Sequence, residues 1–205
     1  MADQIVRDRA ALEALYGEVN EVSALNEITY LHPHYAAFII ASPFAVLSTS
    51  GPHGLDASPR GDTPGFVEIV DDKTLLLADR RGNNRIDSLR NILDNPSVAL
   101  LFLVPGIGET LRVNGTAEIS IDPDLLARFA VQGKAPRSML VVHIESVFFQ
   151  CSRAVIRSEL WNPDRHIARS ALPSTGEILA AVTHDRIDAQ TYDRELPPRL
   201  KATLY

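Results

Sequence analysis

The turn at residues 79–85 (DRRGNNR) lies between two segments of different periodicity and decides how the middle of the chain folds. Before it, residues 74–78 (TLLLA) form a short apolar run of the kind found in buried strands. After it, apolar residues recur at helical spacing over residues 86–93, and this pattern stops at Asn95 and Pro96. The sequence therefore predicts a strand, a polar turn and a helix in succession.

The polar turn combines three arginines, Arg80, Arg81 and Arg85, with a glycine and two asparagines. The arginine fork suits two-point recognition of phosphate, and the backbone N–H groups at a helix start also favour an anion. One hypothesis is a pocket for a phosphorylated ligand. The alternative is a solvated loop turned by glycine, and this turn alone does not decide between them.

Composition narrows the class of protein. The 205 residues suffice for one domain of barrel or α/β type with terminal additions, and the 45% hydrophobic and 22% charged fractions are ordinary for a globular chain. A net charge of −6 argues against a general nucleic-acid partner, which usually has a basic surface. The single cysteine, Cys151, excludes an intramolecular disulfide and a cysteine-rich zinc site.

The sequence also suggests a location. The first seven residues lack the basic and apolar segments of a signal peptide. No uninterrupted apolar stretch approaches the roughly 20 residues of a membrane helix. We therefore expect a cytoplasmic protein that does not bind membranes.

The strands expected around the central turn are mostly joined by short hairpins. A doubly wound parallel sheet would need a helix between successive strands, so this order favours a mainly β fold, an antiparallel, Greek-key-like barrel with flanking helices. We expect one structural domain with an N-terminal helical segment (1–42), a barrel (43–155) and a C-terminal helical extension (156–205). The expected strands are residues 45–50, 55–58, 66–70, 74–78, 98–104, 110–119 and 139–149; the expected helices are residues 5–22, 35–41, 86–93 and 123–131, with two more after residue 154.

A second polar group, residues 58–62 (SPRGD), closes the first expected hairpin. Glycine, aspartate and proline are ordinary turn residues, so this group alone is weak evidence for a site. However, Arg60 adds one more basic side chain to the arginines already noted near strand ends, and an anion site requires such side chains. Arg112 is a separate case, because its alternating strand allows it to face either a ligand or solvent.

Three motifs occur together: residues 58–62 (SPRGD), 82–85 (GNNR) and 88–93 (SLRNIL). With residues 95–102 and 108–115, they make residues 44–161 resemble the pyridoxamine 5′-phosphate oxidase-related, FMN-binding split-barrel family, in particular a bacterial subgroup with these motifs. The resemblance implies a split β-barrel that binds FMN at the interface of a homodimer.

The resemblance also implies which residues contact FMN. One subunit contributes a strand along the ring and ribityl chain, a strand end beside the ring, a phosphate-binding turn with the following helix, and a polar side chain from a later strand. The partner subunit contributes the exit of the last strand, with Trp161 as a further candidate. The residues are Ser58, Pro59, Arg60; Ala78, Asp79; Asn83, Asn84, Arg85, Ser88; Arg112; and, from the partner, Gln150 and Arg157.

Two departures limit the resemblance. Pyridoxamine phosphate oxidases carry two adjacent basic residues in the phosphate turn, whereas this chain has Asn84 before Arg85. Their basic and aromatic C-terminal segment has no convincing match in residues 192–205. The resemblance therefore implies FMN as the cofactor, but it does not imply pyridoxamine phosphate as the substrate. Another branch of the superfamily binds the deazaflavin F420, and clustered arginines do not separate the two cofactors.

The expected function is oxidoreduction of a small molecule by hydride transfer through flavin N5, which requires no protein nucleophile. The catalytic residues are unknown, and Asp62 and Cys151 are the only candidates for an acid or base. The alternatives are an F420-dependent reductase, a flavin-binding or redox-sensing protein without turnover and, more weakly, a haem protein with His53 or His143 as ligand. No metal site is expected, because His32 and His34 lack a nearby carboxylate.

Overall fold

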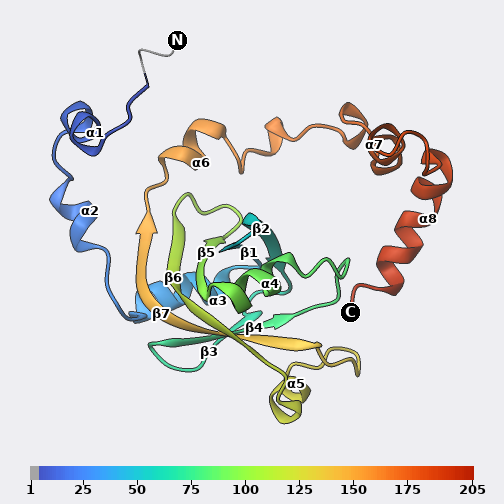
Figure 1. Cartoon of the computed structure of the whole chain (residues 1–205), viewed down its shortest axis with the longest axis horizontal. Coiled ribbons are helices and arrows are strands. Elements are labelled where there is room, and N and C mark those ends of the chain that lie inside the picture. The colour runs from blue at the N-terminus through green and yellow to red at the C-terminus, as the bar shows by residue number, and fades with distance from the viewer. Residues whose placement is uncertain (1–4) are drawn as a thin grey trace.

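The computed structural model describes residues 5–205, which form one seven-stranded sheet in the order β2-β1-β5-β6-β7-β4-β3 (Figure 1). Every neighbouring pair of strands is antiparallel, and the sheet curls into a half-barrel flanked by helices. The predicted mainly β, antiparallel split barrel is therefore confirmed. The strands are β1 (Phe44–Gly51), β2 (Gly54–Gly61), β3 (Val67–Ile69), β4 (Thr74–Asp79), β5 (Ser97–Leu103), β6 (Thr110–Ser120) and β7 (Ser138–Gln150).

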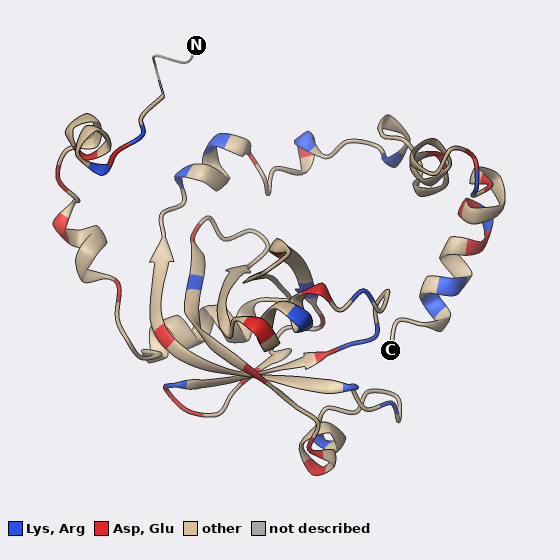
Figure 2. Ribbon diagram, viewed as in Figure 1, with Lys and Arg blue, Asp and Glu red and all other residues tan. Residues whose placement is uncertain are grey.

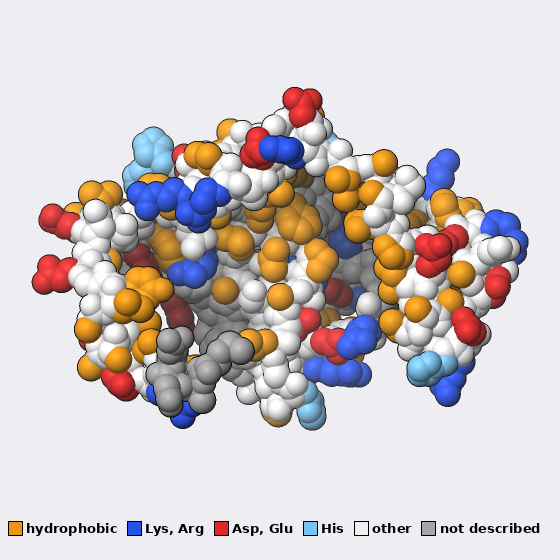
Figure 3. Space-filling model, turned by 90° about the horizontal axis from the view of Figure 1, so that it is seen from above, with side chains coloured by type: hydrophobic (Ala, Val, Ile, Leu, Met, Phe, Trp, Pro, Cys, Tyr) orange, Lys and Arg blue, Asp and Glu red, His pale blue; other side chains and the backbone are white. Residues whose placement is uncertain are grey.

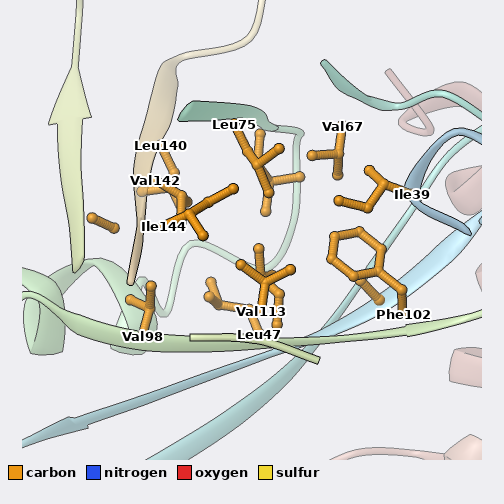
Figure 4. Close-up of a cluster of buried hydrophobic side chains, with 14 of the residues drawn as sticks. Ile39, Leu47, Val67, Leu75, Val98, Phe102, Val113, Leu140, Val142 and Ile144 are labelled. Carbon is orange, nitrogen blue, oxygen red and sulfur yellow. The ribbon is translucent and has the colours of Figure 1, made fainter. Parts of the chain in front are cut away.

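The main core fills the inside of the half-barrel, where alternate residues of the strands point inward. Leu47, Phe102 and Val113 are almost fully buried there, as Figure 4 shows. Helices α3 (Pro33–Ala41) and α4 (Asp87–Asp94) close this core by adding Ile39 and Ile92. Both helices therefore lie on the inner side of the sheet.

Strand β4 is apolar from Leu75 to Ala78 because both of its faces are covered there. Leu75 and Leu77 point into the main core. Leu76 and Ala78 join Met139 in a second cluster beneath α5 (Pro123–Arg128). The continuous apolar run of the sequence is thus explained by burial on two sides.

The N-terminal segment differs from its prediction. The single helix expected over residues 5–22 was wrong, because the structure has α1 (Arg9–Tyr16) and α2 (Glu21–Leu25). Gly17 ends α1 with a φ of 72°, a conformation that glycine adopts without a steric penalty. The Asn20 side chain then caps a new helix by accepting a hydrogen bond from the Val22 N–H.

The first hairpin also differs from its prediction. Strand β2 continues to Gly61, so residues 58–61 are strand residues and not the expected turn. Pro59 is tolerated because β2 is the edge strand of the sheet, where a missing backbone donor costs little. Pairing with β1 then places alternate β2 side chains on one face.

The C-terminal segment forms an arm that extends away from the sheet (Figure 1). It contains α6 (Arg153–Ser158), two short 3₁₀ turns (Pro163–Arg165 and Arg169–Ala171), α7 (Thr175–Val182) and α8 (Ala189–Ala202). Helices α7 and α8 pack against each other, and the chain then returns toward the barrel. Within residues 5–205, no helix has the length and apolar character needed to cross a membrane. The proposed division into three segments stays a prediction.

Candidate functional site

A cavity of about 600 Å³ opens between β2, the end of β4, the following turn and the start of α4. Its wall combines apolar residues, among them Pro59, Phe66, Leu77 and Ala78, with many charged and polar groups. Figure 2 shows the basic segment of the turn after β4 lying close to the C-terminal end of the chain. The polar wall residues are Asp56, Ser58, Arg60, Asp62, Asp79, Arg80, Arg81, Asn83, Asn84, Arg85, Asp87, Ser88, Arg137 and Ser138.

A hydrogen-bonded cluster joins β2 to the first turn of α4. The Ser88 hydroxyl donates to the Asp56 carboxylate over 2.5 Å, and the Ser58 hydroxyl donates to the same oxygen over 2.8 Å. The Arg60 guanidinium donates to the Ser88 hydroxyl over 3.2 Å. Strand alternation places Asp56, Ser58 and Arg60 on one face, so the cluster follows directly from the geometry of β2.

The position of α4 is fixed from its buried side. The buried Asn91 side chain donates to the Thr49 hydroxyl on β1 over 3.1 Å. Gly51 lies against Asn91 so closely that an added Cβ would collide with the amide. The N-terminus of α4 is therefore held at the cavity wall by contacts on the other side of the helix.

The turn before α4 has an unusual backbone. Asn84 and Ile86 have φ values of 60° and 54°. This left-handed conformation is uncommon for Ile86, because isoleucine is β-branched. Among the described residues, no side chain caps the N-terminus of α4. Its first N–H groups are thus open toward the cavity, an arrangement that suits an anion.

The cavity wall carries five arginines and four aspartates. Two of these arginines form ion pairs that neutralise their charge. Arg80 lies 3.2 Å from Asp62, and Arg85 lies 2.8 Å from Asp87. Arg137 donates to the Asn84 side-chain oxygen over 3.0 Å. The wall is therefore positive overall in a chain whose net charge is −6.

The carboxyl groups of the wall have shifted pKa values of opposite sign. Burial raises the pKa of Asp79, and the nearby Arg60 and Arg137 offset this only in part. Burial alone would also raise the pKa of Asp56, but hydrogen bonds from Ser88 and Ser58 and the charge of Arg60 lower it overall. Asp79 is therefore the carboxyl of this pair that holds a proton more readily.

Asp62 is bound to the far end of the chain. Its carboxylate accepts a hydrogen bond of 2.6 Å from the Tyr205 hydroxyl and pairs with Arg80, whose guanidinium also donates to the Phe129 carbonyl. Burial alone would raise the pKa of Asp62, but the hydrogen bonds from Tyr205 and Thr63 and the charge of Arg80 lower it overall. A carboxylate held ionised in this way is a poor proton donor.

The structure brings nine of the twelve expected cofactor residues to this cavity. They are Ser58, Pro59, Arg60, Ala78, Asp79, Asn83, Asn84, Arg85 and Ser88. The sequence reasoning did not select Asp56, Phe66 or Arg137. Asp56 lies two residues before Ser58, so the alternation of β2 gave a signal for it, whereas Arg137 is brought here only by the pairing of β4 with β7.

The other three expected residues lie outside this cavity. Arg112 lies on the outer face of β6, with its guanidinium 4.2 Å from the centre of the Phe148 ring. Its Nε is buried and has no hydrogen-bond partner within residues 5–205. Gln150 ends β7, where its side-chain oxygen accepts a hydrogen bond from Thr110, and Arg157 is exposed on α6.

The remaining candidate residues have ordinary surroundings. Trp161 donates from its indole to the Ile107 carbonyl over 2.8 Å and so ties the C-terminal arm to the turn before β6. Cys151 is exposed at the exit of β7. His32 caps α3 through the His34 N–H, and no group of three potential metal ligands is found among the described residues.

The family model described as pyridoxamine 5′-phosphate oxidase matches residues 31–151, more than half of the chain. The chain therefore belongs to the pyridoxamine 5′-phosphate oxidase family. This match contains both β2 and the turn before α4, and all residues that line the cavity described above lie within it. A search of curated proteins found no match.

Several solved structures are similar to this chain. HupZ of Group A Streptococcus is 22% identical, with a TM-score of 0.47, covering 60% of this chain and 95% of that one. A protein of Clostridium acetobutylicum related to general stress protein 26 is 15% identical, with a TM-score of 0.46 and coverages of 58% and 86%. An FMN-binding protein of Syntrophomonas wolfei is 14% identical, with a TM-score of 0.42 and coverages of 68% and 96%.

Proposed function

We propose that this chain forms a homodimeric flavoprotein that binds FMN in the 600 Å³ cavity and transfers hydride between small molecules. The observation that carries the proposal is the convergence of the motifs at residues 58–62, 82–85 and 88–93 in one cavity, where Arg60 from β2 contacts Ser88 from α4. Membership of the pyridoxamine 5′-phosphate oxidase family supports a flavin as the ligand.

The phosphate end of FMN has a suitable set of donors at the start of α4. The guanidinium groups of Arg60 and Arg85, the Ser88 hydroxyl and the open N–H groups of the helix all face this part of the cavity. Charge-assisted hydrogen bonds of this kind are the strongest that a protein offers to phosphate. The Ser58 and Ser88 hydroxyls now donate to Asp56, and they would rotate to donate to the phosphate instead.

The cavity wall also offers apolar surface to the flavin ring. Pro59, Phe66, Leu77 and Ala78 supply the apolar surface, and Asp79 ends β4 beside them. Burial raises the pKa of Asp79, so its carboxyl keeps a proton to a higher pH than an ordinary aspartate does, and in the protonated form it would donate a hydrogen bond to a ring nitrogen or to the substrate. When bound, FMN supplies the hydride chemistry at N5.

A second subunit completes the site in this proposal. The outer face of the sheet carries Val46, Leu101 and Phe148 beside Arg112, all of them only partly buried, while α3 and α4 occupy the inner face. A partner packed on this face would bring its own Gln150 and Arg157 toward the flavin. It would also offer a hydrogen-bond acceptor to the buried Arg112 Nε.

The first test is the visible spectrum of the purified protein, with mass identification of any small molecule released by heat. We expect FMN, and the bound flavin should be bleached by NADH or NADPH and recover with an acceptor. Bound flavin that no donor reduces would favour a carrier without turnover. The single-band spectrum of F420, or a colourless protein that does not bind added FMN, would contradict the proposed cofactor.

A further inference from the structure

The candidate flavin cavity, the 600 Å³ cavity described above, has a carboxylate at the place proposed for the phosphate. Asp56 on β2 is half-buried and accepts hydrogen bonds from the Ser58 and Ser88 hydroxyls over 2.8 and 2.5 Å. Both bonds end on the same oxygen, Oδ2, and no hydrogen bond from within residues 5–205 reaches Oδ1. A phosphate bound to Ser88 would therefore lie beside a carboxylate with a free oxygen.

The fold holds Asp56 close to the start of α4. Strand register places Asp56 directly opposite Thr49 on β1. The Thr49 hydroxyl accepts the hydrogen bond of the buried Asn91 on α4. Ser88, one turn before Asn91, is only 3% exposed. The helix and the carboxylate are thus attached to the same pair of strands, and the backbone of Asp56 cannot move away from a ligand at this helix start.

The charges around Asp56 are balanced. The cations that act on its carboxylate are Arg60 on its own strand and Arg85 in the turn before α4. Arg85 is already paired with Asp87, the titratable residue of α4 that lines the cavity. Strand β1, the neighbour of β2 in the sheet, carries no titratable residue. Two cations thus face two carboxylates, which favours a phosphate with one negative charge over a phosphate with two.

The hydrogen bonds of Asp56 favour the same form of phosphate. Ser58 and Ser88 have one hydroxyl proton each, so a hydroxyl that turns to a phosphate no longer donates to Asp56. A half-buried carboxylate that loses its donors costs free energy. A doubly charged phosphate offers acceptors only, whereas a singly charged one has a P–O–H group that can donate. The singly charged form would therefore replace a donor that Asp56 loses.

We propose that Asp56 selects the singly protonated form of the ligand phosphate by accepting a hydrogen bond from its P–O–H group. This proposal rests on the proposed binding of FMN in the same cavity. A phosphomonoester loses its second proton near about pH 6. Above this pH the free ligand is mostly doubly charged, so binding takes up one proton from solvent. The affinity for FMN therefore falls as the pH rises.

The first test is fluorescence titration of the apo-protein with FMN between pH 6 and pH 8. The Kd of the wild type should rise about tenfold from pH 7 to pH 8, because one proton is taken up for each FMN bound. In Asp56→Asn the amide donates to the doubly charged phosphate, so its Kd should change less than about twofold over the same range. Equal pH dependence in the two proteins would overturn the proposal.

Two controls separate Asp56 from the other carboxyl groups of the wall. Asp87→Asn removes the same charge from the same wall and leaves Asp56 in place, so its Kd should keep the rise of about tenfold. Riboflavin has the same ring without the phosphate, and its Kd should not rise in this way. A rise of the same size with riboflavin would assign the proton to a group near the ring, such as Asp79, and would overturn the proposal.

The phosphorus NMR spectrum of bound FMN reports the charge of the phosphate directly. At pH 7 we expect the resonance of the singly charged form in the wild type and that of the doubly charged form in Asp56→Asn. A doubly charged phosphate bound to the wild type would overturn the role of Asp56 and leave the proposed function unaffected.

A chain that binds no FMN would contradict the proposed function, and inorganic phosphate then tests Asp56 by itself. A Kd for phosphate that rises with pH in the wild type and not in Asp56→Asn would support the role of Asp56. A Kd with the same pH dependence in both, or no binding of phosphate, would overturn it.

Discussion

At the scale of single residues, Arg60 is the basic residue most central to the candidate flavin cavity. It is half-buried and contacts Ser88, whereas the Arg85 side chain is 75% exposed and already paired with Asp87. We predict that Arg60→Ala weakens FMN binding by about 1.5–3 kcal/mol, the range for a charge-assisted hydrogen bond. Arg85→Ala should have a smaller effect, because solvent screens its charge. Fluorescence titration of the apo-protein with FMN measures both.

Arg90→Ala is the matched control for this pair. Arg90 is exposed on the same helix and does not line the cavity, although it also lies near Asp87. Its removal changes the net charge equally and should leave FMN affinity unchanged. If all three variants bound FMN equally well, the phosphate would lie elsewhere.

Asp79 supports a prediction on stability. Its folded-state pKa is raised above the ordinary value of 3.8, so the folded chain keeps this proton to a higher pH than the unfolded chain does. The free energy of unfolding therefore falls as pH rises from the unfolded-state pKa to the folded-state pKa, and the loss is complete above the folded-state pKa. We predict that Asp79→Asn raises the Tm of the apo-protein at pH 7 and that the gain shrinks toward pH 4.

Asp62 provides the opposite case for the same experiment. Its folded-state pKa is lowered, so its stabilising effect is present above the ordinary value of 3.8 and is lost as pH falls through the folded pKa. Asp62→Asn should therefore lower the Tm at pH 7. Thermal melts from pH 4 to pH 7 check both variants. Equal changes of the same sign would mean that the surroundings of the two carboxyls do not differ as described.

Site residues that are close in sequence were the predictable ones. The motifs at residues 58–62 and 82–85 contribute nine residues to the cavity wall, because strand alternation and a single turn fix their relative positions. Arg137 was missed because strand pairing brings it to the cavity, and Tyr205 was missed because the fold of the C-terminal arm brings it to the wall residue Asp62. Such long-range placement leaves no local periodic signal.

At the scale of elements, the irregular pairing of β6 with β7 gives a stability prediction. The register shifts between Asn114 and Gly115, where a Cβ on Gly115 would collide with the His143 carbonyl. Because a backbone atom cannot move aside as a flexible side chain can, we predict that Gly115→Ala lowers the free energy of unfolding by about 1–3 kcal/mol or more. Urea denaturation of the apo-protein measures this.

Gly82→Ala is the control, since a Cβ there would meet no atom within 4 Å and the residue needs no positive φ. Its effect should stay within about 0.5 kcal/mol, as for most surface substitutions. A Gly115→Ala variant as stable as this control would show that the bulge can relax. The close approach would then not explain the glycine.

Elements with strong periodicity were predicted well, and those controlled by neighbours were not. The strands from β4 to β7 lie near their expected limits because apolar alternation or double-sided burial marks them in the sequence. Strand β2 was placed too short because Pro59 is read as a break, and only the edge position of the strand explains why it is tolerated. The split of the first helix depended on the backbone of Gly17, for which helical spacing gives no signal.

At the scale of the whole molecule, the two ends of the chain carry much exposed apolar surface. Leu15, Val19 and Leu25 near the N-terminus are 69%, 77% and 70% exposed, and Val182 on α7 is 68% exposed. Figure 3 shows hydrophobic side chains spread around a hollowed centre between the two ends. Large exposed apolar surfaces mark interaction sites, which agrees with the proposed homodimer.

The outer face of the central strands allows this homodimer to be tested by one substitution. Leu101 is partly buried there, between Val46 on β1 and Arg112 on β6. A glutamate at this position would place a charge in the proposed interface, whose desolvation is costly, without touching the inner core. We predict that Leu101→Glu converts a dimer into a monomer and weakens FMN binding at least about tenfold, because each flavin would lose its contacts with the second subunit.

Sedimentation of the FMN-loaded protein measures the mass against the 22.5 kDa of one chain, and absorbance at the flavin band reports the cofactor in the same cell. Leu55→Glu is the matched control, since Leu55 is 90% exposed at the tip of the first hairpin and should leave both mass and flavin unchanged. A wild-type chain that sediments as a monomer with one FMN bound would contradict the shared site. A Leu101→Glu monomer that keeps full FMN affinity would show instead that the dimer forms but each cavity holds its flavin alone.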